Sequence, residues 1–347
     1  MTEKLNKVFF LGAGFSKAID SRYPVLNELT KYIAEKVRCD KSSLACHYDN
    51  ELADLIKDNV ENLLTYLSTD WPWKSAKQKY TNKALYVEIT EILGEHFVKL
   101  SKNNFTDKKF INMNILPGLL TSIYTDYQNV DFITLNYDMI VERCLWEVFR
   151  KLKSYQPRLD EFYRYPITEI GARGANPYIH ETSPFEKIPA VIKLHGSANW
   201  FWEGVSASDQ IYYIDGTENK IELDLLSGLT PYIVPPVLDK SSFYDHTAIR
   251  YLWKQAFDLL RNADEIYIVG FSFPQTDLSV KNLFQAALRG SRARVYVVNC
   301  DTKDNLSHNY SGIFGRECII HYDYCGTQDA FQRFVNEKLT NRGQPWN

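Results

Sequence analysis

The sequence lacks the features that would direct a chain into or across a membrane. Its first residues, MTEKLNKVFF, contain neither the apolar core nor the cleavage site of a secretory signal. No uninterrupted apolar run reaches the roughly 20 residues that a membrane-spanning helix needs. We therefore expect a cytoplasmic protein that does not insert into membranes.

Closely spaced cysteines are also missing. The chain has six cysteines in 347 residues, and none of them belongs to a C-x-x-C pair. Scattered cysteines in a chain without an export signal indicate reduced thiols and not disulfides. Because structural zinc sites usually take their ligands from such pairs, the sequence predicts no metal site.

A strong charge of one sign is absent as well. The net charge is −3 at pH 7, so the chain as a whole does not have the charge of a nucleic-acid-binding protein. One basic run, KSAKQKYTNK at 74–83, leaves direct nucleic-acid binding as an alternative, although such runs are usually solvated faces. The 23 tyrosines and 19 phenylalanines indicate a packed globule and not a disordered chain.

What the sequence does contain is a series of short apolar runs that end in Gly, Asn, Asp or Ser. Such runs are typical of buried strands in a parallel sheet. They lie at 7–14, 130–138, 190–197, 265–273 and 293–301. Between them are amphipathic helical patterns, at 23–37, 53–68, 84–100 and 246–263. This alternation predicts an α/β fold, Rossmann-like, with a mostly parallel sheet.

The spacing of the runs predicts a single domain, 1–347, with a helical insert. Residues 20–125 separate the first two predicted strands, which is far more chain than one crossover helix needs. We therefore expect this segment to form the insert. A second, less regular insert is expected at about 145–190.

Polar residues and glycines follow most of the predicted strands. In open parallel sheets, ligands bind beyond the carboxyl ends of the strands, which lie along one edge. The sequence therefore predicts one shared site at this edge. Its candidate residues are Gly12, Ala13, Gly14, Ser16, Asn136, Asp138, His195, Gly270, Ser272, Asp277, Asn299 and Asp301.

Two of these motifs also have simpler interpretations. The glycine pair could form an ordinary strand-to-helix turn, since Lys17 stands where a dinucleotide fingerprint has its third glycine. Asn136 and Asp138 could form a turn that caps the following helix. No acidic strand end follows the first strand by about 20 residues, which disfavours a hydride-transfer Rossmann enzyme.

The other strand ends have simpler interpretations too. His195 could be a buried core histidine, or a general base at the end of its strand. Asp277 is expected to cap the helix that begins near Leu278. Asn199 and Trp200 are expected in a helix or a loop.

Taken in order, these motifs resemble those of the sirtuin superfamily. The order is GAG-x-S, T-x-N-x-D, a strand followed by His-Gly, then G-x-S, then V-x-N. The segments PPVLDK (235–240) and LWKQAFDLLRNADEIYIVGFSFPQTD (252–277) are similar to the bacterial sirtuin-like branch in particular. The recognisable blocks cover less than a third of the chain.

The resemblance implies that NAD binds at this edge of the sheet, as a substrate. It implies two catalytic residues: Asn136, which would orient a water or a ribose hydroxyl, and His195, which would be the base. The remaining positions would contact the dinucleotide. They are Gly12, Ala13, Gly14 and Ser16 at the pyrophosphate, Asp138 at the carboxamide, Gly270 and Ser272 at phosphate or ribose, and Asn299 at the adenine-side ribose.

The sequence departs from the protein deacylases of that superfamily. Their zinc module of two C-x-x-C pairs is absent, because no cysteine lies between Cys144 and Cys300. Their Phe-Gly-Glu motif, which lines the acyl-lysine channel, is absent too. Water is then the remaining nucleophile. The resemblance thus implies an NAD glycohydrolase (NADase) that releases nicotinamide and ADP-ribose without a metal.

Sirtuin-like proteins of this branch act in bacterial anti-phage defence, where NAD depletion halts the infected cell in abortive infection. By this resemblance we expect an antiviral activity that infection switches on. We also expect a homo-oligomer and a regulator in trans, such as a HerA-like ATPase. An NAD or ADP-ribose sensor without turnover is the main alternative, ahead of a deacylase or a nucleic-acid-binding protein.

Overall fold

The computed structural model describes most of the chain. The described residues are 5–39, 59–101, 111–126, 129–153, 157–169, 187–203, 210–214, 228–237, 240, 244–274 and 277–339. Parts of three predicted segments, the helical insert at 20–125 with its helix at 53–68 and the second insert at 145–190, lie outside them. Within the described residues, no helix is both long and apolar enough to cross a membrane.

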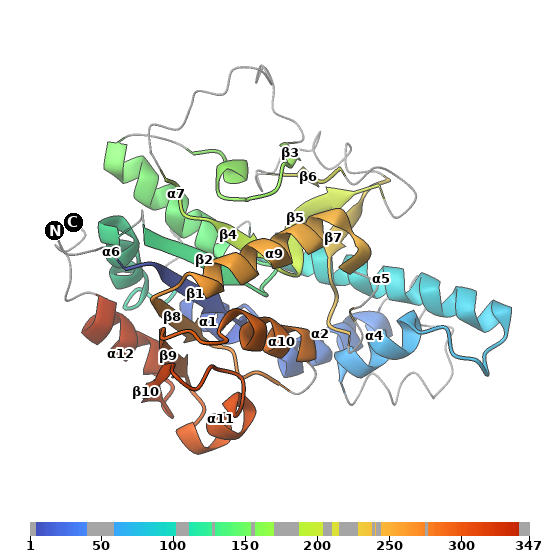
Figure 1. Ribbon diagram of the computed structural model, residues 1–347. Helices are drawn as coiled ribbons and strands as arrows, with labels where there is room; N and C mark the ends of the chain where they lie inside the picture. The colour runs from blue at the N-terminus through green and yellow to red at the C-terminus, as the bar shows by residue number, and fades with distance from the viewer. Residues whose placement is uncertain are drawn as a thin grey trace.

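The core of the fold is a parallel sheet of six strands, which confirms the predicted α/β architecture (Figure 1). Each neighbouring pair in it runs parallel. In spatial order the strands are β10 (Ile319–Cys325), β9 (Arg294–Asn299), β8 (Glu265–Val269), β1 (Lys7–Leu11), β2 (Val130–Thr134) and β4 (Val191–Lys193).

Helices cover both faces of this sheet. Every residue of β2 and β8 is buried, and alternate side chains of a strand point to opposite faces. The covering elements are α1 (Ala13–Ile19), α6 (Leu116–Asp126), α7 (Ile140–Lys153), α9 (Thr247–Arg261), α10 (Leu278–Ala287), α11 (Lys303–Tyr310), α12 (Ala330–Phe334) and the helical turn η5 (Val335–Leu339).

A row of stacked aromatic rings fixes the register of the central strands. Phe9 on β1 pairs with Phe132 on β2 and with Tyr267 on β8, with ring centroids 5.5 and 4.7 Å apart. Tyr267 in turn stacks on Tyr296 of β9 at 5.1 Å. Cross-strand aromatic pairs of this kind stabilise a sheet beyond simple burial, because a slip by one residue would separate them.

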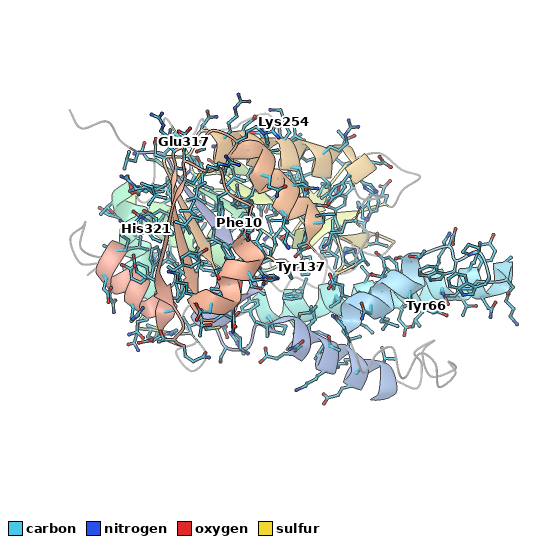
Figure 2. The ribbon with its side chains drawn as sticks, turned by 60° about the horizontal axis from the view of Figure 1, so that its bottom comes forward. Phe10, Tyr66, Tyr137, Lys254, Glu317 and His321 are labelled. Carbon is cyan, nitrogen blue, oxygen red and sulfur yellow. The ribbon has the colours of Figure 1, made fainter. Side chains whose placement is uncertain are left out.

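The segment between β1 and β2 is helical in its described parts. It contains α2 (Leu26–Cys39), α4 (Val60–Ser68) and α5 (Ala76–Ser101), followed by α6. Together α4 and α5 form an arm, residues 60–101, that extends away from the central sheet (Figures 1 and 2). Figure 2 shows Tyr66 out on this arm and Tyr137 where the arm meets the body. The limits of the insert, 20 and 125, stay a prediction.

A second, smaller sheet lies against α5. Its order is β3 (Thr168–Glu169), β6 (Tyr212–Tyr213), β5 (Gly196–Trp202) and β7 (Thr230–Ile233). The short helix η3 (Leu159–Glu161) precedes it in sequence. Gly94 of α5 faces Pro231 of β7, where an added Cβ would lie 2.8 Å from the proline ring. The absence of a side chain at Gly94 therefore lets the helix pack closely on the sheet.

The structure corrects the prediction for residues 190–200. The run 190–197 was expected to be one strand, but β4 ends at Lys193 and a new strand, β5, begins at Gly196. Gly196 has φ +73°, a conformation that L side chains rarely adopt, and this allows the turn. Asn199 and Trp200 lie in β5 and not in a helix or a loop. The sequence had left their element open, and the strand preference of aromatic residues such as Trp200 fits this position.

Candidate functional site

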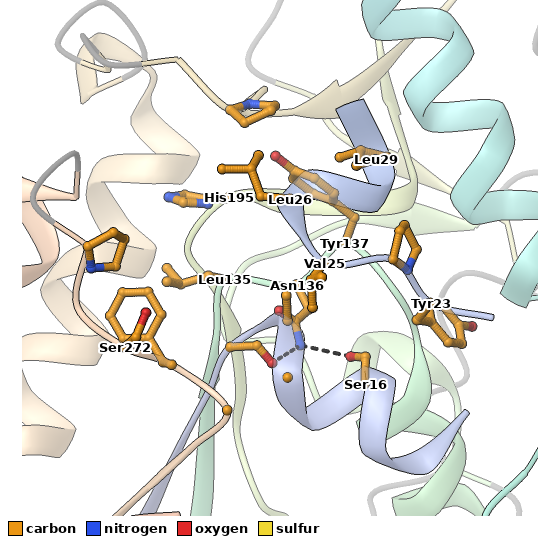
Figure 3. A pocket seen from close by; sticks show the side chains of 18 of the residues that line it. Ser16, Tyr23, Val25, Leu26, Leu29, Leu135, Asn136, Tyr137, His195 and Ser272 are labelled. Carbon is orange, nitrogen blue, oxygen red and sulfur yellow. Dashed lines mark hydrogen bonds between the residues drawn. The ribbon is translucent and has the colours of Figure 1, made fainter. Parts of the chain in front are cut away.

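A pocket of about 410 Å³ lies at the carboxyl edge of the parallel sheet. Its size is in the range of sites that bind small molecules. The structure brings all the predicted catalytic and NAD-contacting residues to its lining. These are Gly12, Ala13, Gly14, Ser16, Asn136, Asp138, His195, Gly270, Ser272 and Asn299. Figure 3 shows Asn136 beside Ser16, with His195 and Ser272 in the same pocket.

The glycine loop is shaped by close packing against the end of β8. The amide of Gly12 donates to the carbonyl of Val269, and that of Gly14 to the carbonyl of Gly270, each at 3.0 Å. A Cβ on Gly12 would lie 2.6 Å from the Gly270 carbonyl oxygen. Both glycines are thus required by this approach of two backbone segments. Their N–H groups are already bonded, which the motif alone did not reveal.

A hydrogen-bond chain connects this loop to the turn after β2. The side-chain amide of Asn136 donates to the carbonyl of Gly12 at 2.9 Å and to Oγ of Ser16 at 2.8 Å. Ser16 Oγ then donates to Oδ2 of Asp138 at 2.5 Å. Because both donors are engaged, the Asn136 amide is held in one orientation, and its Oδ1 has no partner among the described residues.

Asp138 has a structural contact as well. Its Oδ1 accepts a hydrogen bond from the amide of Ile140 at 3.0 Å, which caps the start of α7. The simpler interpretation of this turn therefore holds alongside a position in the pocket. The pKa of the Asp138 carboxyl is raised, mainly by burial, and the Lys193 ammonium and the Ser16 hydrogen bond oppose this rise.

His195 occupies the turn between β4 and β5 and is buried. Its backbone carbonyl accepts from Val234 at 2.8 Å, and the preceding carbonyl of Leu194 accepts from the Trp253 indole at 3.2 Å. Its Nε2 is buried and has no hydrogen-bond partner in the described part of the chain. Burial, together with the nearby Lys240 ammonium, lowers the pKa of His195 to about 3. At neutral pH the ring is thus uncharged and able to accept a proton.

An ion pair lies beside His195. Asp277 was among the candidate residues from the sequence, but its pairing with Lys240 was not predicted. Lys240 Nζ and Asp277 Oδ1 are 2.5 Å apart, and both residues line the pocket. Asp277 does stand at the N-cap of α10, as expected, but its side chain makes no capping hydrogen bond. Its Oδ1 instead accepts a hydrogen bond from the Lys240 ammonium. Lys240 lies in the PPVLDK segment, where the sequence offered no reason to single it out.

The structure also adds an apolar wall that sequence patterns missed. It consists of Tyr23, Pro24, Val25, Leu26, Leu29, Phe97, Tyr137 and Pro236. Phe97 comes from the arm, and its ring lies 5.3 Å from that of Tyr137. The Tyr137 hydroxyl donates to the carbonyl of Val234 at 2.6 Å. Of these residues, only Tyr137 could have been singled out from the sequence, because it lies between Asn136 and Asp138 in the T-x-N-x-D motif.

A second chamber adjoins the first. It measures about 400 Å³ and shares five lining residues with the pocket, namely Gly14, Val25, Gly270, Asn299 and Cys300. The glycine loop therefore stands between two spaces of similar size. Asn299 ends β9 at this junction, and its Oδ1 accepts from the amide of Asp301 at 3.1 Å. A ligand with two bulky halves and a narrow middle would match this shape.

The described residues contain no group of three or more His, Cys, Asp or Glu side chains placed to hold a metal ion. Cys144, Cys300, Cys318 and Cys325 are free thiols.

Several solved structures have a fold similar to that of this chain. Solved structures with a similar fold include a Sir2 homologue in complex with NAD (13% identity, TM-score 0.42, covering 97% of this chain and 91% of that one). Another is a Sir2 enzyme studied for its mechanism and regulation (15% identity, TM-score 0.41, covering 96% and 92%). A third is a Sir2 homologue in complex with 2'-O-acetyl ADP-ribose (14% identity, TM-score 0.44, covering 96% and 93%). At such identities the likeness concerns the fold alone.

In sequence, no curated protein matches the chain. The family described as "SIR2-like domain" matches residues 130–308. The matched segment runs from β2 into α11 and includes Asn136, His195 and Ser272, but not the glycine loop. Because this match spans more than half of the chain, the protein belongs to the SIR2-like domain family.

Proposed function

We propose that this protein is an NAD glycohydrolase, which cleaves NAD⁺ with water to nicotinamide and ADP-ribose. The observation that carries the proposal is the buried Nε2 of His195, which has no hydrogen-bond partner among the described residues, in a pocket that also contains the fixed amide of Asn136. A buried polar atom without a partner costs free energy, so its presence in a pocket suggests that a ligand completes it.

The two chambers support a dinucleotide as the ligand. They meet at Gly14 and Gly270, where the absence of side chains lets two backbone segments pack closely at the junction of the chambers. The pyrophosphate would lie across this junction. The nicotinamide ribose would then lie in the chamber with His195 and Asn136. The adenosine half would lie in the other chamber, beyond Asn299.

The reaction needs a water, a base and a stabilised cation. As the bond from C1' of the ribose to the nicotinamide nitrogen breaks, its electron pair neutralises the pyridinium and C1' gains oxocarbenium character. Water adds its oxygen to C1' and gives one proton to His195. Asn136 Oδ1 would orient this water or a ribose hydroxyl. The Asp138 carboxylate would stabilise the positive charge.

The low pKa of His195 keeps its ring uncharged, but it also makes the ring a weak base. A ring with a pKa of about 3 is neutral over the whole physiological range, so one ring nitrogen is unprotonated before substrate binds. A base this weak gives little driving force by itself. The negative charge of a bound pyrophosphate would raise the pKa of His195 and so strengthen the base when substrate is present.

The test is NAD turnover followed by chromatography of nicotinamide and ADP-ribose. His195→Ala and Asn136→Ala should each lower kcat, and loss of the base alone should cost roughly 100- to 10,000-fold. His321→Ala is the matched control, because His321 lies on β10 and outside this pocket. In water labelled with ¹⁸O, one labelled oxygen should enter ADP-ribose. Equal turnover by wild type and both site variants would disprove the proposal.

The main alternative is a sensor that binds NAD or ADP-ribose without turnover. Calorimetric binding of NAD with no product in any condition would favour it. A deacylase would need an acetyl-peptide substrate and is tested by the same chromatography. Nucleic-acid binding through the run at 74–83 predicts salt-dependent retention of DNA.

The biological setting belongs to the same proposal. Unregulated NAD hydrolysis would be toxic, so we propose a cytoplasmic homo-oligomer that phage infection activates through a partner such as a HerA-like ATPase. Turnover should then be measured with and without this partner, and the mass of the assembly by light scattering. A fully active, unregulated monomer at micromolar concentration would contradict this part. The limits of the domain, 1–347 with an insert at 20–125, are part of the same proposal.

A further inference from the structure

A second charged pair lies directly behind the pocket and has no access to solvent. Lys193, the last residue of β4, and Glu142, in the first turn of α7, are both completely buried. Their Nζ and Oε1 atoms are 3.0 Å apart. Neither residue lines the pocket. The mechanism proposed above makes no use of them.

The pair is tied to the turn that carries Asn136 and Asp138. Lys193 Nζ donates a second hydrogen bond to the backbone carbonyl of Asp138. Glu142 Oε1 also accepts from the hydroxyl of Tyr163 at 2.9 Å. Lys193 therefore connects the end of β4, two residues before His195, with the turn after β2. One side chain bridges the two segments that hold the proposed catalytic residues.

Stability alone does not explain a pair in this position. Burying two charges carries a large desolvation cost, and apolar residues of similar size often replace such pairs without loss of stability. Here the cost is increased, because Glu142 Oε2 is buried without a hydrogen-bond partner among the described residues. A role in the geometry and charge of the neighbouring turn would account for the pair.

We propose that Lys193, held by Glu142, is a positioning residue that fixes the turn at Asp138 and favours the ionised form of the Asp138 carboxyl. Through the chain from Asp138 to Ser16 to Asn136, this also sets the direction of the Asn136 amide. The effect on catalysis rests on the proposed NAD glycohydrolase activity. The effect on the turn and on Asp138 does not.

Several charged or titratable groups face the Asp138 carboxyl. The Lys193 ammonium stabilises its ionised form, and the Glu142 carboxylate opposes it to a smaller extent. The Tyr23 hydroxyl, on the segment after α1, and the Cys144 thiol, on α7, also interact with Asp138. Removal of Lys193 and Glu142 together therefore raises the pKa of Asp138, because the larger of the two effects is lost.

The experiment uses the double variant Lys193→Met/Glu142→Gln, which avoids leaving one buried charge alone. The matched control is Lys187→Met/Asp131→Asn, which removes a pair with a 3.0 Å contact at the opposite end of β2. Three quantities are measured: the thermal midpoint, kcat and KM for NAD, and the titration of the Asp138 carboxyl by ¹³C NMR. The Asp138→Asn variant identifies that NMR signal.

We expect the double variant to fold and to lose kcat by about 100-fold with little change in KM, since small misplacements of reacting groups cost this much. The acid limb of its kcat/KM profile should move to higher pH, and the NMR titration should move with it. In the Asp138→Asn background, the same double substitution should no longer move the acid limb.

A double variant with the kcat and the Asp138 titration of the control would overturn the proposal. A fall in thermal midpoint without these two changes would mean that the pair is structural only, and would overturn it too. If the wild type neither binds nor cleaves NAD, the proposed function fails. The NMR titration still tests Lys193 in that case.

Discussion

The two ends of the parallel sheet differ in what surrounds their polar groups. At the amino ends of the strands, charged residues are held in ion pairs: Lys7 with Asp126, Asp131 with Lys187, and Glu265 with Arg294. At the carboxyl ends, the glycine loop packs closely against the turn at Gly270. There the buried Nε2 of His195 has no hydrogen-bond partner among the described residues.

This difference separates what the sheet needs for stability from what it needs for a ligand. Ion pairs and stacked rings stabilise the amino ends and the centre of the sheet. The carboxyl ends have the ion pairs Lys193–Glu142 and Lys240–Asp277, and in addition an uncharged buried histidine, a fixed amide and two adjoining chambers, which the proposed ligand would fill. Natural proteins tolerate such local costs mainly at functional sites. Substitutions that act at one end and not at the other test this distinction.

The largest effect is expected from Gly270→Ala. Gly270 has φ +65°, and a Cβ there would lie 2.2 Å from the amide nitrogen of Phe15 and 2.4 Å from the carbonyl carbon of Gly14. The conformation alone costs about 1–2 kcal/mol. The collision must also move the glycine loop, at a further cost of about 1–3 kcal/mol. Urea unfolding measures the sum.

Gly290→Ala is the matched control for this experiment. Gly290 has a similar φ of +73°, but an added Cβ would meet nothing within 4 Å. It should therefore show the conformational cost without the collision. If both variants lose the same free energy of unfolding, the close approach of the two backbone segments has no energetic weight, and the glycine loop must have another reason to exist.

The next effect concerns the pH dependence of stability. The pKa of His195 is about 3 in the folded protein, and that of an unfolded histidine is near 6.5. Between these values the unfolded chain binds a proton that the folded chain does not. Stability from this residue is therefore complete above pH 6.5 and is lost as pH falls, with a slope of about 1.4 kcal/mol per pH unit.

His195→Gln should remove this slope. The measurement is the free energy of unfolding in urea at several pH values between 4.5 and 7.5. His321→Gln, on β10 at the edge of the sheet, is made as the control. An unchanged slope in His195→Gln would show that the ring of His195 is accessible to protons in the folded protein, contrary to its buried position.

Much of this architecture could be predicted from the sequence because buried parallel strands have a recognisable residue pattern. Each apolar run is buried on both faces and stops at a polar residue or a glycine, so the strand ends were visible. Since parallel strands share one carboxyl edge, the candidate residues were expected to meet there. The structure brings all of them to one pocket.

The rest depended on contacts between distant segments. The apolar wall at Leu29 and Phe97 comes from helices whose patterns are those of any amphipathic helix. Lys193 and Glu142 are 51 residues apart in the chain, and a lysine inside a strand is normally taken for a solvated residue. The partner of Asp277 was hidden for the same reason. Local patterns supply the strands, whereas burial of charge is decided by tertiary packing.

The smallest effect is expected from the charges beside His195. Burial is the main cause of its low pKa; the Lys240 ammonium lowers the pKa further, and the Asp277 carboxylate raises it. Lys240→Met should therefore raise the pKa of His195, both by removing a cation and by leaving Asp277 without its partner at 2.5 Å. Asp277→Asn should lower it. The imidazole proton signals in NMR, followed as a function of pH, measure both changes.

The opposite signs make this pair of variants a sharp test of the cause. Loosening of the pocket would let water reach His195 and would raise its pKa in both variants. Only the direct effect of charge predicts a rise in Lys240→Met and a fall in Asp277→Asn. A rise in both would assign the low pKa to burial alone. The Lys240–Asp277 pair would then only link two segments, like the pairs at the amino ends of the sheet. It would have no direct effect on the pKa of His195.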